Sequence, residues 1–192
     1  TLNFINKLTE QGHLVEGIEF NEIDYIVPAY YVLTTAEASS NLSRFDGVRY
    51  GFHATDATDL ESTYRNTRSQ GFGKEVQKRI MSGAFVLSAG YYDAYYSKAQ
   101  KVRRIIANKT NETFKQYDFI LCPTTPAPAY KLGEKSDDPI AMYLGDIFTV
   151  QANLVGVPGI SIPYSNTNSG LPIGLQLMAG KFEEAKLFDF SS

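Results

Sequence analysis

Two short apolar runs near the C-terminal end most constrain the fold of this 192-residue chain: GISIP at 159–163 and IGLQLM at 173–178. Each has the length of a strand, and the polar segment SNTNSG at 165–170 supplies turn residues between them. The pattern predicts a hairpin or two adjacent strands. A third apolar run, DFILC at 118–122, ends at Pro123 and predicts a short buried strand.

Helices are predicted for much of the remaining chain, so the fold class is α/β. Apolar spacing and end signals indicate helices at 3–12, 26–43, 57–69, 91–116 and 141–154. Asp24 is expected to cap the second of these helices, and Pro28 to lie in its first turn, where a missing N–H is tolerated. The alternating segment HLVEGIEF at 13–20 predicts a short strand. The proline-rich segment 123–140 is expected to be a surface loop.

Composition limits the classes of function. The net charge of −3 argues against a broad electrostatic surface for nucleic acid. Cys122 is the one cysteine, which excludes an intrachain disulfide and favours a reducing compartment. No apolar run has the length of a membrane span, and the first residues lack the layout of a signal peptide. A cytoplasmic protein without membrane contact is therefore the default expectation.

The residues alone predict no self-contained catalytic or metal site. His13, His53 and Cys122 are far apart in the sequence and lack neighbouring ligands. The segment GFGK at 71–74 lacks the spacing of a phosphate-binding loop, and no nucleophile elbow of the GxSxG type is present. The sequence therefore favours recognition of a substrate or a partner as the role of this chain.

Four segments carry a resemblance to a known family. They are PAYYVLTTAEASSNLSRFDGVRYG (28–51), the stretch from RSQGFGKEVQKRI onward (68–103), DFILCPTTPAPAYKLGEKSDDPIAMYLGDIFTV (118–150) and GVPGISIPYSNTNSGLPIGLQLMAG (156–180). Together they resemble the A subunits of glutamyl-tRNA(Gln)/aspartyl-tRNA(Asn) amidotransferases, within the amidase signature family. The resemblance implies an α/β amidase signature fold, in which a mixed sheet is flanked by helices.

The resemblance also implies what residues 1–192 leave out. Family members use a Ser–cis-Ser–Lys triad on a Gly/Ser-rich segment in their N-terminal half, and no such segment occurs here. We therefore expect residues 1–192 to be the C-terminal fragment of a single amidase domain, inactive by itself. The whole enzyme would hydrolyse glutamine and supply the ammonia that converts Glu-tRNA(Gln) to Gln-tRNA(Gln).

Three substrate-binding residues are carried over from the family, position by position. Arg79 in GFGKEVQKRI would bind the glutamine carboxylate, Asp146 in AMYLGDIFTV the ammonium group, and Tyr30 in PAYY would border the pocket. An arginine fork and a carboxylate suit these two charges. Without the resemblance, Arg79 would pass for a surface residue, Asp146 for the cap of a helix beginning at Ile147, and Tyr30 for a core residue.

The implied partners are a kinase-like subunit, a small third subunit, and tRNA through these two. ATP and Mg²⁺ would serve the assembled complex, and no cofactor is expected in this chain. Two alternatives remain open. One is a general amidase acting on another carboxamide, and the other is a non-catalytic scaffold. The scaffold would use the tyrosines at 91–96 and the basic residues at 98–109, although an aromatic face packed on a sheet and a solvated basic face are the simpler interpretations.

Overall fold

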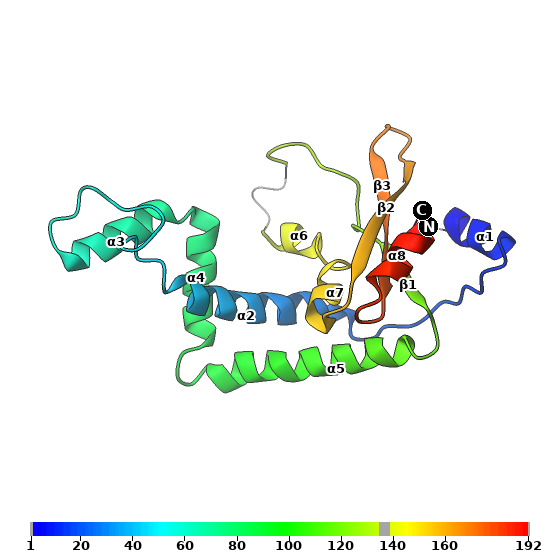
Figure 1. Ribbon diagram of the computed structural model, residues 1–192, viewed down its shortest axis with the longest axis horizontal. Helices are drawn as coiled ribbons and strands as arrows, with labels where there is room; N and C mark the ends of the chain where they lie inside the picture. Colours follow the sequence, from blue (N-terminus) through cyan, green and yellow to red (C-terminus); the bar gives the residue numbers. More distant parts are fainter. Residues whose placement is uncertain (1, 135–138, 192) are drawn as a thin grey trace. The chain divides into compact units, whose positions relative to one another are not determined.

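The computed structural model describes residues 2–134 and 139–191, which form two compact units (Figure 1). The first unit comprises residues 1–28 and 102–192, and the second comprises residues 29–101. Each is described by itself. None of the helices in the described part of the chain is both long enough and apolar enough to cross a bilayer.

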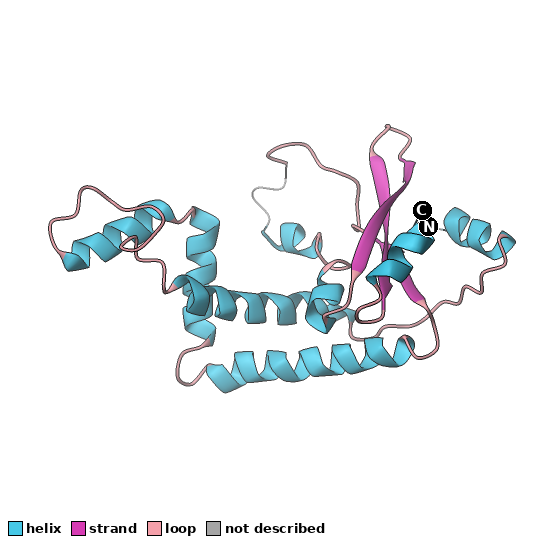
Figure 2. Cartoon of the chain, in the orientation of Figure 1, coloured by secondary structure: helices cyan, strands magenta, loops and turns pink. Residues whose placement is uncertain are grey.

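A three-stranded antiparallel sheet organises the first unit (Figure 2). Its strands are β1 (Phe119–Pro123), β2 (Gly159–Asn166) and β3 (Pro172–Ala179), in the order β1-β3-β2. The predicted hairpin of β2 and β3 is confirmed, and so is the strand that ends at Pro123. The α/β class is confirmed with them.

The last five residues of the central strand β3 are all buried. Since successive side chains of a strand point to opposite sides, both faces of β3 are covered. On one face, Leu177 and Ala179 join Leu187 of helix α8 (Glu184–Ser191) in a core cluster. Partly buried side chains complete this cluster: Phe119, Leu121, Ile160, Ile162 and Phe190. On the other face, Gln176 and Met178 are buried too.

Besides the first residues of α2 (Ile23–Leu42), further helices contribute to the described part of the first unit. They are α1 (Leu2–Glu10), the greater part of α5 (Lys98–Thr113), α6 (Pro139–Leu144) and α7 (Val150–Val155). The Nε atom of Arg103 donates to the carbonyl of Leu154 at 2.7 Å, and the Gln151 amide donates to the Thr110 hydroxyl at 3.0 Å. Both bonds fasten α7 to α5.

Two predictions for the first unit are wrong. Residues 13–20 are irregular and not a strand, because alternation alone does not supply a partner, and no other strand pairs with them among the described residues. The helix predicted at 141–154 is two helices separated by a turn. Gly145 and Asp146 donate their N–H groups to Met142 and Tyr143 three residues back, which closes α6 before α7 begins.

The second unit is helical. It contains most of α2 (Ile23–Leu42), together with α3 (Leu60–Gly71), α4 (Lys74–Val86) and the π-helix η1 (Tyr92–Ser97). Helix α3 begins with a capping box, in which Asp59 accepts from the Ser62 N–H at 2.7 Å. Pro28 lies inside α2 and not in its first turn, because this helix begins three residues earlier than predicted.

Helices α2 and α4 approach most closely at Gly83. A Cβ atom at this position would lie 1.9 Å from the Thr35 carbonyl oxygen and 2.6 Å from the Ser39 Cβ. Glycine is thus required by the crossing and not by backbone conformation. The contact fixes which turns of the two helices meet.

The Gly83→Ala variant is expected to destabilise the second unit. Alanine gains about 0.5–1 kcal/mol in helix propensity, but a methyl group that pushes backbone from backbone costs about 1–3 kcal/mol or more. Hydrogen exchange of α2 and α4 amides, together with urea unfolding, measures the loss. Gly17→Ala is the control, since open space surrounds that position. Unchanged protection of both helices would contradict the close crossing.

Cys122 lies in β1 beside the Gln176 side chain, whose amide approaches the thiol at 3.5 Å. Burial raises the pKa of this thiol to about 11, although the hydrogen bond from Gln176 acts in the opposite direction. The protonated thiol is therefore the form present at neutral pH. A raised pKa favours the fold fully below the ordinary value of 9.0, and this contribution is lost as the pH rises through 9 toward 11.

Alkylation of Cys122 by iodoacetamide is expected to be slow in the folded protein. At pH 8 the two-unit rise in pKa alone makes the rate about 100-fold lower than that of an ordinary thiol. Mass spectrometry should show a rate that rises about tenfold with each pH unit and levels off only above about pH 11. Protein unfolded in urea provides the reference rate, and rapid modification of folded protein at pH 8 would contradict the assignment.

Candidate functional site

The surroundings of Arg79 on α4 form the most organised polar cluster in the second unit. The Nε atom of Arg79 donates to Oε1 of Glu75 at 3.1 Å. Its Cζ atom lies 5.5 Å from the centre of the Tyr31 ring, within the range of a cation–π contact. The Tyr31 ring meets the Tyr30 ring edge to face at 5.4 Å. Two of the three predicted residues, Tyr30 and Arg79, therefore both contact Tyr31.

Helix geometry explains this arrangement. Tyr31 and Thr35 are one turn apart on α2, and Arg79 and Gly83 are one turn apart on α4. The close contact of Gly83 with the Thr35 backbone brings the two helices together, and the long Arg79 side chain reaches the Tyr31 ring.

Opposing influences set the pKa of Arg79. Partial burial is the largest of them and lowers it. The hydrogen bond to Glu75, the negative charge of Glu75 and the neighbouring tyrosines act the other way, and together they place the pKa above its ordinary value. Arg79 is therefore a fixed cation. Its side chain is 35% exposed, so a ligand from outside can reach it.

Asp146 belongs to the first unit, in the turn between α6 and α7. It is half-buried, and its carbonyl oxygen accepts from the N–H groups of Thr149 and Val150 at 3.0 and 3.1 Å. The N-cap of α7 is Thr149, so Asp146 does not cap a helix that begins at Ile147. The convergence of Asp146 with Arg79 and Tyr30 remains a prediction.

Two further polar side chains bond to nearby backbone. The Asn153 amide donates to the Thr149 carbonyl at 3.1 Å. Asp46 accepts from the Val48 N–H at 2.9 Å, and no ion pair joins it to Arg44 or Arg49 in the part of the chain that is described.

Within the second unit, the tyrosine cluster at 91–96 packs on helix α4. Tyr91 and Tyr95 contact Phe85 of α4 with ring centres 4.3 and 5.8 Å apart, and Tyr92 contacts Tyr96 at 5.1 Å. Phe85, Tyr91, Tyr92 and Tyr95 all remain more than 40% exposed. The rings therefore form a surface patch in the second unit.

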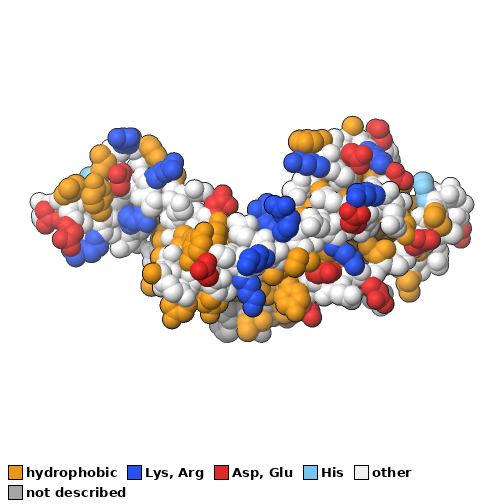
Figure 3. Space-filling model, turned by 90° about the horizontal axis from the view of Figure 1, so that it is seen from below, with side chains coloured by type: hydrophobic (Ala, Val, Ile, Leu, Met, Phe, Trp, Pro, Cys, Tyr) orange, Lys and Arg blue, Asp and Glu red, His pale blue; other side chains and the backbone are white. Residues whose placement is uncertain are grey.

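The basic residues of 98–109 are exposed, which confirms the predicted solvated face. Figure 3 is viewed from the side on which α5 lies in Figure 1, and it shows Lys and Arg side chains at the surface there. Acidic and apolar side chains lie among them, so the face is not a continuous basic stripe.

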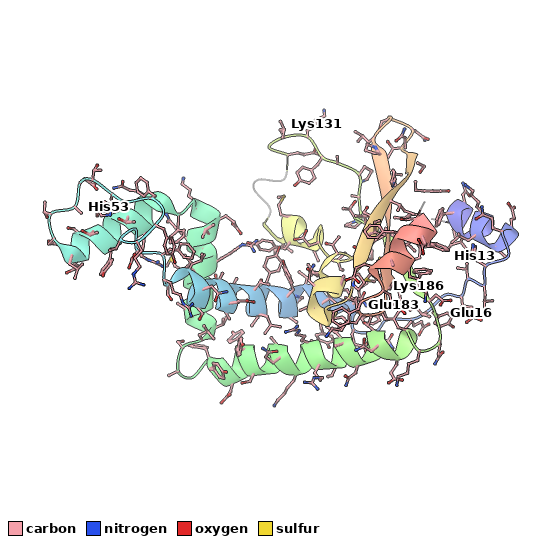
Figure 4. The ribbon with its side chains drawn as sticks, viewed as in Figure 1. His13, Glu16, His53, Lys131, Glu183 and Lys186 are labelled. Carbon is pink, nitrogen blue, oxygen red and sulfur yellow. The ribbon has the colours of Figure 1, made fainter. Side chains whose placement is uncertain are left out.

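Three labelled side chains of the first unit, Glu16, Glu183 and Lys186, have structural partners (Figure 4). The Tyr117 hydroxyl bonds to Glu16, and this hydrogen bond raises the pKa of the tyrosine. Lys186 bonds to Asp118 at 2.7 Å and lies 3.7 Å from Glu183. The bond to Lys186 lowers the pKa of Asp118. These contacts join the segment before β1 to residues 13–20 and to α8.

The described residues offer no metal site and no activated nucleophile of the His-dependent kind. No group of three or more His, Cys, Asp or Glu side chains among them is arranged to hold a metal ion. His53 Nδ1 lies 3.1 Å from the Gly47 carbonyl oxygen, and the His13 ring packs edge to face on Phe190. What the chain presents is a cation framed by tyrosines, a group suited to a carboxylate.

Known proteins resemble nearly the whole chain. The A subunit of the glutamyl-tRNA(Gln) amidotransferase from Koribacter versatilis (strain Ellin345) is 54% identical over 183 residues, covering 95% of this chain and 38% of that protein. Its counterpart from Syntrophus aciditrophicus (strain SB) is 55% identical over 181 residues, covering 94% of this chain and 37% of that protein. The chain thus spans well under half the length of these curated relatives.

Solved structures agree in fold. The A subunit of the glutamyl-tRNA(Gln) amidotransferase from Thermotoga maritima matches with a TM-score of 0.62 at 44% identity, over 89% of this chain and 32% of that chain. A crystal structure of an amidase matches with a TM-score of 0.72 at 18% identity, over 99% of this chain and 39% of that one, which shows the shared fold. A family model described as Amidase matches residues 1–188, and the chain belongs to the amidase family.

Proposed function

We propose that this chain is part of the glutamine-hydrolysing A subunit of a tRNA-dependent amidotransferase. The identity of 52–55% to proteins named as such subunits supports the assignment. The observation that carries it is the arrangement of Arg79, held by Glu75 and packed on Tyr31 while its side chain remains accessible. A cation held in this way is suited to the carboxylate of a free amino acid.

Glutamine offers three groups for recognition: an α-carboxylate, an α-ammonium and the carboxamide that reacts. In our proposal Arg79 binds the carboxylate through paired N–H donors. Asp146 binds the ammonium group, and Tyr30 borders the pocket beside Tyr31. Opposite charges at the two ends of the amino-acid backbone would fix the direction in which the carboxamide points.

The reaction itself needs groups that we place outside residues 1–192. A serine of a Ser–cis-Ser–Lys triad would attack the carboxamide, release ammonia and form a glutamyl-enzyme that water hydrolyses. Backbone N–H groups would stabilise the oxyanion. Residues 1–192 alone are therefore expected to be inactive and to contribute recognition.

The proposed setting is a cytoplasmic complex. A kinase-like subunit would use ATP and Mg²⁺ to activate Glu-tRNA(Gln) and would then accept the ammonia, while a small third subunit would complete the heterotrimer. This chain would meet tRNA only through the complex, in keeping with its net charge of −3 and its interrupted basic face.

Glutamine analogues test which residue recognises which charge. 4-Aminobutanamide lacks the α-carboxylate, and glutaramate lacks the α-ammonium. In the full-length enzyme with its partners, Arg79→Ala is expected to lower kcat/KM for L-glutamine roughly thirtyfold to several thousandfold. This factor corresponds to a loss of about 2–5 kcal/mol in transition-state binding free energy. The same change should leave kcat/KM for 4-aminobutanamide nearly unaltered. Asp146→Ala should lower kcat/KM for L-glutamine similarly and leave kcat/KM for glutaramate nearly unaltered. Ammonia release is the measurement.

Matched controls separate recognition from loss of fold. Arg65→Ala removes an exposed arginine of α3, and Asp93→Ala removes an exposed aspartate of η1, so both should keep full preference for L-glutamine. A wild-type enzyme without preference for L-glutamine over either analogue would favour a general amidase. Retained preference in the Arg79 and Asp146 variants would remove both residues from the pocket.

A further inference from the structure

The hydrogen bond between Glu75 and Arg79 points to a role for Glu75 that the pocket residues do not cover. We propose that Glu75 is a positioning residue, which holds Arg79 by Nε so that its two terminal nitrogens face the α-carboxylate of glutamine. This inference rests on the proposed function of Arg79. It assigns Glu75 no direct contact with the substrate.

The shape of the guanidinium group underlies the proposal. Its five N–H donors lie in one plane, and a carboxylate can pair with the outer edge formed by Nη1 and Nη2 or with a side edge that includes Nε. Glu75 occupies Nε, at 3.1 Å. Among the described residues, no hydrogen bond is made to Nη1 or Nη2 of Arg79, so the outer edge is available.

Tyr31 supplies the second restraint. With the Arg79 Cζ atom 5.5 Å from its ring centre, the ring limits motion out of the guanidinium plane, while Glu75 limits rotation within it. The Tyr31 ring is itself held by its edge-to-face contact with Tyr30. Two contacts therefore fix the long Arg79 side chain before a ligand arrives, which reduces the entropy lost on binding.

A second pair on the same chain shows that spacing alone does not produce this geometry. Glu61 and Arg65 of α3 have the same four-residue separation, but their contact is 3.8 Å long and uses Nη1, an outer nitrogen. Their side chains are 88% and 67% exposed, against 53% for Glu75 and 35% for Arg79. The Glu61 pair is an ordinary surface pair and provides the matched control.

Two substitutions distinguish positioning from charge. Glutamine at position 75 keeps an oxygen that can accept from Nε but removes the negative charge, whereas alanine removes both. If Glu75 acts by position, Glu75→Gln retains function and Glu75→Ala loses it. If Glu75 acts only as a competing negative charge, both substitutions strengthen binding of the substrate carboxylate.

The experiment compares L-glutamine with 4-aminobutanamide in the full-length enzyme with its partners. Glu75→Ala is expected to raise KM for L-glutamine about tenfold, the effect of one charge-assisted hydrogen bond at a partly exposed site. Its kcat should change less than about twofold, because the bond acts on binding and not on the reacting carboxamide. KM for 4-aminobutanamide should stay unchanged. Glu75→Gln and Glu61→Ala should both resemble wild type.

Each other outcome overturns the proposal in a recognisable way. An equal loss with both substrates would show a merely structural role for Glu75. A lower KM for L-glutamine in both Glu75 variants would show that its charge only competes. A wild-type KM in Glu75→Ala, with preference lost in Arg79→Ala, would leave the pocket standing without Glu75. Preference retained in Arg79→Ala would overturn the pocket assignment itself.

Discussion

Strand β3 has a neighbouring strand on each edge and buried side chains on each face. The first unit is therefore organised by the groups that cover the two faces of β3. Its apolar face is covered by α8. Its other face contains Gln176, a buried amide that must find hydrogen-bond partners. The amide donates to the Phe148 carbonyl at 2.9 Å. Because Phe148 lies two residues after Asp146, the centre of the sheet fixes the turn that carries this proposed ammonium ligand.

A steric constraint has the matching role in the second unit. Gly83 allows α4 to meet α2 at Thr35, and one turn away on both helices this places Arg79 against Tyr31. A larger residue at 83 would push α4 away from α2 and would thereby displace Arg79 from Tyr31. The proposed pocket therefore depends on a residue that contacts no ligand.

Local signals in the sequence predicted much of the fold. The turn residues of 165–170 act over a few positions, and they were sufficient to place the hairpin of β2 and β3. The strand predicted at 13–20 failed because pairing is a non-local property. The single helix predicted at 141–154 failed because backbone hydrogen bonds around Gly145 end α6 early.

The residues of the candidate site also differ in whether a local signal in the sequence could identify them. Arg79, Asp146 and Tyr30 were proposed from their position in family motifs, because spacing alone does not single them out. Glu75 and Tyr31 were missed, although the four-residue separation of Glu75 from Arg79 was a usable signal. The same separation at Glu61 and Arg65 produces a looser pair, so only the contact with Tyr31 across two helices distinguishes the cluster around Arg79.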